Sequence, residues 1–162
     1  MPITSTDIQY RLSGGAANSN PDASLGGAKS SELVPVDLFD DVSSAESAAG
    51  DTEYRIIYVH NNHGSLTLQN AVIWISANTT GSRIAIGLGA SAINGTESTI
   101  ANENTAPGGV TFSQPSSKGA GLSLGSIPPG QHKAVAIRRA VVAATPAAND
   151  TYTLSVEGDT AA

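Results

Sequence analysis

The residues able to do chemistry here are three histidines and a few grouped acids, because the chain contains no cysteine. His60 and His63 are three residues apart, a spacing that suits two metal ligands on one face of a helix. Their segment, however, has the pattern of a strand end followed by an Asn-Asn-His-Gly turn, which gives the two rings no shared direction. His132 follows a Pro-Pro-Gly turn, and we expect a solvated histidine at the edge of a strand. No histidine metal site is predicted.

The acids offer two further possibilities. Asp37, Asp40 and Asp41 are close enough in sequence to hold calcium, which prefers several oxygen ligands. The spacing of an EF-hand loop is absent, so we interpret this segment as a solvated acidic turn. Glu97 and Glu103 are the candidate carboxylates for a glycosidase pair, but they lie on a long polar stretch with no apolar neighbours in sequence to raise the pKa of either.

Other catalytic signatures are missing from the sequence. There is no Gly-x-Ser-x-Gly elbow, and the glycine-rich stretches at 87–91 and 119–125 lack the pattern of a dinucleotide loop that opens a helix. The sequence therefore predicts no catalytic residue, no metal ligand and no cofactor, and the protein is expected not to be an enzyme.

The composition predicts a folding chain with a thin core. Ala, Ser and Gly make up 61 of the 162 residues, whereas Leu, Ile, Val and Phe together number 34. That share lies just above the roughly 20% below which chains tend to stay disordered. No apolar stretch is long enough to span a membrane and the first residues do not resemble a signal peptide, so we expect no membrane partner. Without cysteine, a disulfide framework is excluded.

Charge is distributed unevenly along the chain. The net charge is −6, and residues 1–53 hold nine acids against two bases, whereas residues 54–162 hold five acids and six bases. An acidic first third does not attract a phosphate backbone. Arg138 and Arg139 are adjacent, but neighbours on a strand point to opposite faces and form no single basic patch. The sequence therefore predicts no nucleic-acid partner.

Short apolar segments separated by Gly, Pro and Asn predict the fold. Both faces of 54–60 are mostly apolar, which indicates a central strand. Residues 13–32 lack periodicity and predict loop, and 43–50 predicts one helical turn or a polar loop. Strands are expected at 7–12, 54–60, 71–76, 83–88, 109–113, 121–124, 131–139 and 151–157.

Strands of this number, without a convincing amphipathic helix, predict an all-β antiparallel β-sandwich. An immunoglobulin-like module is the first expectation and a jelly roll is the alternative. We expect an N-terminal strand with an extended, acidic, Gly/Ser-rich arm over residues 1–53, and a sandwich domain over 54–162. Trp74, the only tryptophan, lies among β-branched residues and is expected in the core.

Four segments resemble a known group of proteins. They are IQYRLSGGAANSNPDASLGGA at 8–28, LFDDVSSAESAAGDTEYRIIYVHNN at 38–62, GTESTIANENTAPGGVTF at 95–112 and IPPGQHKAVAIRR at 127–139. Together they resemble virion structural proteins of tailed bacteriophages, of the head decoration or cement type. The resemblance carries no catalytic or ligand motif, so it transfers no functional residue.

The resemblance implies a structural protein that decorates and stabilises the outer surface of a capsid. Its partners would be the major capsid protein and further copies of itself, commonly as a homotrimer, assembled in the bacterial cytoplasm. Tail or fibre components and surface glycan-binding or host-binding immunoglobulin-like modules remain alternatives. Five apolar residues flanked by loop are the candidates for partner contact, with one more strand of the sandwich as the other interpretation: Leu33, Val34, Val36, Leu38 and Phe39.

Overall fold

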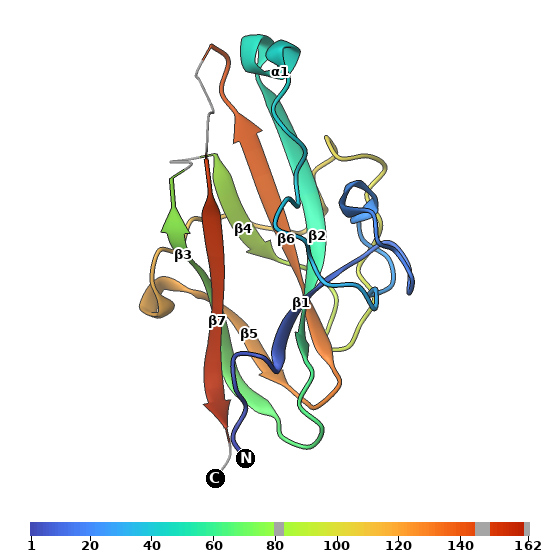
Figure 1. Ribbon diagram of the computed structural model, residues 1–162, viewed down its shortest axis with the longest axis vertical. Coiled ribbons are helices and arrows are strands. Elements are labelled where there is room, and N and C mark those ends of the chain that lie inside the picture. Colours follow the sequence, from blue (N-terminus) through green and yellow to red (C-terminus); the bar gives the residue numbers. More distant parts are fainter. Residues whose placement is uncertain (80–82, 145–149, 161–162) are drawn as a thin grey trace.

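The computed structural model describes residues 1–79, 83–144 and 150–160. Within these ranges the chain forms seven strands, one short α-helix and two 3-10 turns (Figure 1). The strands are β1 (Ile8–Leu12), β2 (Asp51–Asn61), β3 (Leu68–Asn78), β4 (Ile84–Leu88), β5 (Leu122–Ile127), β6 (His132–Val141) and β7 (Tyr152–Thr160). The helix α1 covers Ser44–Ala49, and the 3-10 turns η1 and η2 cover Pro21–Ala23 and Lys118–Ala120.

The strands form two antiparallel sheets that pack face to face, which confirms the predicted β-sandwich. One sheet has the order β1-β2-β6-β4 and the other the order β5-β3-β7. β2 lies between β1 and β6, as the two apolar faces of its sequence predicted. No helix in the described ranges is long and apolar enough to cross a membrane.

Two expectations about boundaries differ from the structure. β2 begins at Asp51, so the division predicted between residues 53 and 54 falls inside a strand. The strand predicted at 109–113 does not form, and only a single bridge joins Ile86 to Ser113. Val110 and Phe112 pack instead against the outer face of the four-stranded sheet. Burial of these two side chains thus replaces a ladder of backbone hydrogen bonds.

The main core lies between the two sheets. It consists of inward-facing aliphatic side chains from all seven strands, together with Leu38 from the irregular segment before α1. On β2 the inward residues include Ile57 and Val59, whereas Ile56 and Tyr58 point to the opposite face. Because both faces of β2 are covered, the fold needs a further layer of chain outside the four-stranded sheet.

That outer layer comes from the loops, and it gives the protein a second small core. Ile56, Tyr58, Ala134 and Ala136 of the sheet are buried there with Ile100. The cluster is completed by partly buried Tyr54 of β2 and by three partly buried residues from the loops: Leu25, Val110 and Phe112. Tyr58 ties the layer down, since its hydroxyl donates to the carbonyl of Gly27 (2.6 Å) and accepts from a loop N–H (2.8 Å).

The first third is irregular, as expected, but it lies along the sandwich and does not extend away from it (Figure 1). Its contacts are mostly hydrogen bonds from small polar side chains, which leave no hydrophobic periodicity. The buried Ser13 hydroxyl donates to the carbonyl of Ile56 (2.6 Å) and accepts from the N–H of Gly26 (3.0 Å). Gly26 has φ +104° and passes so close to Ser98 that a Cβ would lie 2.2 Å from its carbonyl oxygen.

Trp74 is not in the core, contrary to the prediction from its neighbours. Ile73 and Ile75 are buried between the sheets, so the alternation of β3 directs Trp74 to the outer face, where it is half-buried. It lies opposite Ser155 of β7 in the ladder. The β-branched run around it made both faces of the strand look buried, but the second buried cluster lies on the other sheet.

Candidate functional site

The five residues predicted to contact a partner do not share one environment. Leu38 is 3% exposed in the main core, and Val34 and Phe39 pack against that core. Leu33 and Val36 are 55% and 102% exposed. The segment therefore divides into an anchoring set and a pair of solvent-facing apolar side chains.

The segment is not one more strand of the sandwich. One isolated bridge pairs Leu33 with Arg11, and the N–H of Val34 donates to the carbonyl of Tyr10 (2.9 Å). Residues 35–39 form no strand pairing within the described chain, and Pro35 removes one backbone donor. Side chains, rather than a backbone ladder, hold the rest of the segment.

Phe39 is held between two guanidinium groups. The Cζ atoms of Arg55 and Arg139 lie 5.2 and 5.0 Å from the centre of its ring. Arg55 comes from β2 and Arg139 from β6, so Phe39 fastens the segment to two central strands of the four-stranded sheet. Cation–π contacts that are partly removed from water are worth about 1–2 kcal/mol each.

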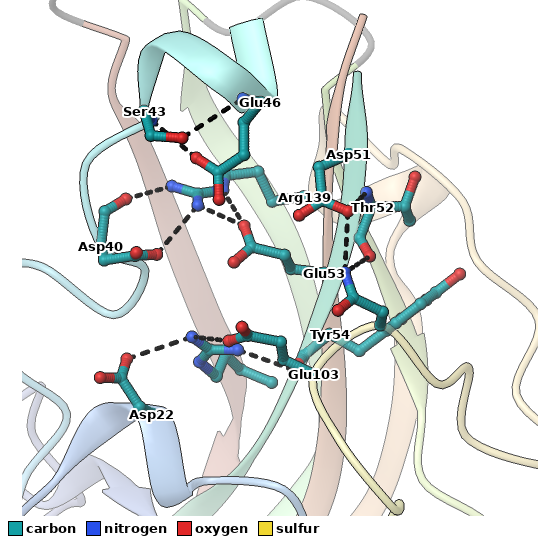
Figure 2. A network of polar contacts seen from close by, with 12 residues as sticks. Asp22, Asp40, Ser43, Glu46, Asp51, Thr52, Glu53, Tyr54, Glu103 and Arg139 are labelled. Atoms are coloured by element: carbon teal, nitrogen blue, oxygen red, sulfur yellow. Dashed lines mark hydrogen bonds and ion pairs between the residues drawn. The ribbon is translucent and has the colours of Figure 1, made fainter. Parts of the chain in front are cut away.

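Arg139 is the centre of a charged network that includes the start of α1 (Figure 2). Its Nε donates to Glu53 Oε2 (2.6 Å), its Nη2 pairs with the same carboxylate and with Asp40 Oδ1 (3.1 Å), and its Nη1 donates to the carbonyl of Asp40. Arg138, its neighbour, points to the other face and lies 5.5 Å from the ring of Phe112. The predicted separation of the two arginines is therefore confirmed.

Glu53 is a buried carboxylate with half of its hydrogen-bonding capacity unused. Its side chain is 1% exposed, and its Oε1 has no hydrogen-bond partner within the described chain. Burial raises the pKa of Glu53 above its ordinary value, and the Arg139 guanidinium opposes that rise. A charged oxygen without a partner is costly in such a place, which marks this corner of the fold as unusual.

Arg55 extends the network to the loops. Its side chain is fully buried, and its Nη2 pairs with Asp22 (3.1 Å) of η1 and Glu103 (2.8 Å) of the long loop. These pairs hold two loops of the outer layer at the same strand. Glu103 is thus an ion-pair partner, whereas Glu97 is buried and accepts a hydrogen bond from the N–H of Ser91 (2.9 Å).

Glu97 is buried although its neighbours in sequence are polar, because its backbone N–H donates to the buried Tyr58 hydroxyl of the sheet. The two glutamates have separate local partners, and these contacts do not join them as a catalytic pair.

The acids that come together are Asp40, Glu46 and Glu53, whereas Asp37, Asp40 and Asp41, which were interpreted as a solvated turn, are exposed. One carboxylate oxygen from each of the three clustered acids lies within 4.8 Å of the others. Two sequence signals point to the missed members. Ser43 and Glu46 form an S-x-x-E capping box, which places Glu46 in the first turn of a helix. Glu53 is two residues before Arg55 and four before Ile57, and this even spacing puts it on the same, inward face of β2.

Two hollows flank the exposed Val36. One, of about 290 Å³, is lined by residues 36–42 and by Arg83, Ile84, Arg139, Val141, Asp150 and Tyr152. The other, of about 220 Å³, is more apolar, and Tyr10 and Leu154 contribute from the two sheets. The Tyr10 hydroxyl bridges the sheets by donating to the Leu154 carbonyl (3.1 Å). Burial raises the pKa of Tyr10 and raises that of Tyr152 to about 12, so both hydroxyls stay protonated at neutral pH.

The histidines do not form a metal site in the described chain. His60 is buried on β2, whereas the ring of His63 accepts the N–H groups of Ser65 (3.2 Å) and Leu66 (3.0 Å) in the turn. His132 was expected to be solvated at an edge, but β6 is an inner strand and the residue is 9% exposed.

Burial lowers the pKa of His132, whose ring lies edge-on to Tyr58 with 4.6 Å between centres. Burial also lowers the pKa of His60, to about 4, with further contributions from nearby Lys29, Arg11 and His132. Both rings are therefore neutral at pH 7.

No protein-family model, no curated protein and no solved structure matches this chain.

Proposed function

We propose that this protein is a viral structural protein that decorates and cements the outside of a bacteriophage capsid. The resemblance of its four segments to head decoration proteins supports the proposal. The docking face would be the exposed pair Leu33 and Val36, together with the hollows beside Val36. The major capsid protein is the proposed partner.

The observation that carries the proposal is the way this apolar pair is presented. Side chains as exposed as Leu33 and Val36 lose contact with water only when another molecule covers them. Leu38 and Phe39 anchor the same segment in the core and between two arginines, so docking would cost little ordering entropy. Contacts of this size are weak singly, and many copies on a symmetric shell make them sufficient.

The free edge of β7 supports the same face. In the described ranges β7 pairs only with β3, and its other edge lies next to the hollow lined by Val36 and Leu154. An open edge carries unpaired backbone groups that an extended segment of a partner can bind. An edge strand and exposed apolar side chains therefore occur together here, and one carbonyl of that strand, at Leu154, already accepts the Tyr10 hydroxyl.

Binding to undecorated capsids tests the proposal. Wild-type protein should bind in a saturable manner and raise the temperature at which the capsids rupture. The double variant Leu33→Ser/Val36→Ser should lose most of this binding, because each substitution removes about 1–2 kcal/mol of apolar burial per contact. Val142→Ser is the matched control, since Val142 is also exposed (53%) but lies directly after β6, which ends at Val141. Absence of binding by the wild type, or equal loss in the control, contradicts the proposal.

Two further points of the proposal need their own measurements. A homotrimer, which the resemblance suggests, should appear in sedimentation equilibrium as three times the 16.3 kDa chain mass. Copy number per virion separates a head protein from the alternative of a tail or fibre component, since hundreds of copies are expected on a head.

A glycan-binding module is a second candidate, and the position of Trp74 favours it. A half-buried tryptophan on the outer face of a sheet offers an aromatic surface to a sugar ring. A glycan array should then give signals that Trp74→Ala abolishes, whereas the capsid-binding proposal predicts that the same variant binds capsids normally.

A further inference from the structure

We propose that a basic cluster on the outer face of the four-stranded sheet binds one inorganic phosphate ion in its hydrogen phosphate form. Three members of the cluster come from neighbouring strands and one from the loop that covers them: Arg11 of β1, His60 of β2, His132 of β6 and Lys29 of the loop. An ion bound there would join three strands to the outer layer of loops.

Strand alternation and register bring the three strand residues together. Leu12 and Val59 face the main core, so their neighbours Arg11 and His60 point to the outer face. In the ladder His60 lies directly opposite His132, and Arg11 is two residues from the β1 residue opposite His60. Residues directly opposite in an antiparallel pair share a face, and long side chains reach their diagonal neighbours. The three side chains are therefore neighbours on one surface.

The covering loop brings Lys29 to the same place. The loop is bound to β2 through the carbonyl of Gly27 (2.6 Å) and to β1 through the N–H of Ser30 (2.8 Å), one on each side of Lys29. The charge of Lys29 acts on both buried rings, since it lowers the pKa of His60 and of His132 in addition to the larger effect of burial. Lys29 therefore completes the cluster from above the sheet.

The cluster carries positive charge without a counter-charge. Arg11 and Lys29 are half-buried, and neither forms an ion pair within the described chain. The charged groups that lower the pKa of His60 are all basic, and burial together with the Arg11 charge lowers the pKa of Lys29. Glu97 lies next to Tyr58, but its side chain already accepts a backbone N–H (2.9 Å). An anion with two negative charges would balance the two cations.

Buried nitrogen atoms without a partner are concentrated in the same cluster. Seven buried side-chain atoms lack a hydrogen-bond partner in the described chain, and three of them are Arg11 Nε, His60 Nδ1 and His132 Nδ1. The two histidines are 8% and 9% exposed, so bulk water does not satisfy their rings. Buried polar atoms normally have a partner, and one oxyanion offers several oxygens in one place.

The histidine tautomer favours an oxyanion that still carries a proton. His132 Nε2 lies 3.3 Å from the carbonyl oxygen of Gly95, which can only accept, so the proton of the neutral ring is on Nε2 and Nδ1 is an acceptor. Hydrogen phosphate suits both kinds of group, because its charged oxygens accept from Arg11 and Lys29 while its O–H donates to a ring nitrogen. Sulfate has the same charge but no O–H at neutral pH.

NMR titration of the intact protein with sodium phosphate at pH 7.5 and constant ionic strength tests the inference. The ring signals of His60 and His132 should shift in a saturable manner with a Kd of about 1 mM, which is reasonable for so small a ligand. His63 is the internal control and should not shift, because its ring belongs to the turn and accepts two N–H groups there. Sodium sulfate should bind at least fivefold more weakly.

Two variants separate a built site from general attraction of anions. Lys29→Gln and Arg11→Gln each remove one cation and should weaken phosphate binding at least tenfold. Lys118→Gln is the matched control, since Lys118 is an exposed lysine of η2 paired with Glu157, and it should bind within twofold of the wild type.

Thermal unfolding gives a second measurement. With 20 mM phosphate the unfolding temperature of the wild type should rise by about 4–7 °C. Phosphate also stabilises proteins by exclusion from their surface, so the result that matters is the smaller rise in Lys29→Gln than in Lys118→Gln.

Several results would overturn the inference. They are no saturable shift of the two buried rings up to 20 mM phosphate, unchanged affinity in Lys29→Gln, or equal weakening in Lys118→Gln. Equal affinity for sulfate would contradict the role of the O–H. Phenyl phosphate, which has largely lost its proton at pH 7.5, should bind more weakly than inorganic phosphate, and equal binding would overturn the assignment to the inorganic ion.

Discussion

Acidification from pH 7 to pH 5 should destabilise this protein through His60, and His60→Gln should remove that part of the loss. The ring is buried on the outer face of β2, and the charged groups that act on it are cations: Lys29, Arg11 and, when protonated, His132. Only the backbone of Gln131 favours the protonated form. The folded state therefore binds a proton at His60 much less readily than the unfolded chain does.

The size of the effect follows from the two pKa values. The pKa of His60 falls from the ordinary 6.5 to about 4 on folding. Between these values the unfolded state holds the extra proton, so stability is complete above pH 6.5 and decreases as the pH falls towards 4. Linkage gives a loss of about 2 kcal/mol between pH 7 and pH 5. For a protein with a free energy of unfolding of about 5–15 kcal/mol, that loss is readily measured.

Urea unfolding of the wild type and His60→Gln at pH 7, 6 and 5 is the assay. The free energy of unfolding of the variant should decrease by about 2 kcal/mol less than that of the wild type over this range. Glu53, whose pKa is raised by burial, contributes with the opposite sign as the pH falls, but it is present in both proteins and cancels in the comparison. His132→Gln should reduce the acid sensitivity in the same direction, since burial lowers the pKa of His132 too.

Two results would refute the reasoning. If wild type and His60→Gln lose stability in parallel, His60 is not the group that resists protonation. NMR titration of the ring gives an independent answer, since a midpoint near 6.5 in the folded protein would mean that neither burial nor the neighbouring cations act as inferred.

Further substitutions test the packing. Leu38→Ala should cost about 2–5 kcal/mol in urea unfolding, because a buried anchor of the irregular segment is lost, and an unchanged midpoint would show that the segment is loosely held. Gly26→Ala should lower the free energy of unfolding by more than about 2 kcal/mol, since the new Cβ would meet the carbonyl oxygen of Ser98. Gly130→Ala is the control, because Gly130 also has positive φ but lies in open space, and it should cost about 1–2 kcal/mol. Equal losses in the two variants would argue against the clash. Tyr58→Phe should lose about 1–3 kcal/mol and speed hydrogen exchange in the loops bound by the hydroxyl, and unchanged exchange would contradict its anchoring role.

Much of the sandwich was predictable because its strands have strong local patterns. The two apolar faces of β2 predicted a central strand, and the alternation in Ile8–Leu12 predicted a strand with one wet face. The capping box before α1 was also visible, although the sequence alone left helix and loop as alternatives. Local backbone preference and burial agree at these places, so neighbouring residues are sufficient to predict them.

The candidate site was only partly predictable. The sequence singled out the apolar run 33–39, but no pattern indicated that Leu38 and Phe39 would face inward while Leu33 and Val36 face solvent. That division depends on two arginines from separate strands that enclose Phe39. Phe39 is 16 positions from Arg55 and 100 from Arg139, and contacts at such separations leave no trace in local periodicity.

By itself, the sequence determined the β-sandwich class, most of the strands and the acidic first third. Tertiary structure decided what that acidity does: Asp22 pairs with Arg55, and Asp40 and Glu53 surround Arg139. It also decided that Trp74 faces outward, because the covering loops lie on the other sheet. The ion pairs and the position of Trp74 have the same physical reason. Alternation along a strand distinguishes its two faces, but distant segments of the chain decide which face is buried and which charges it meets.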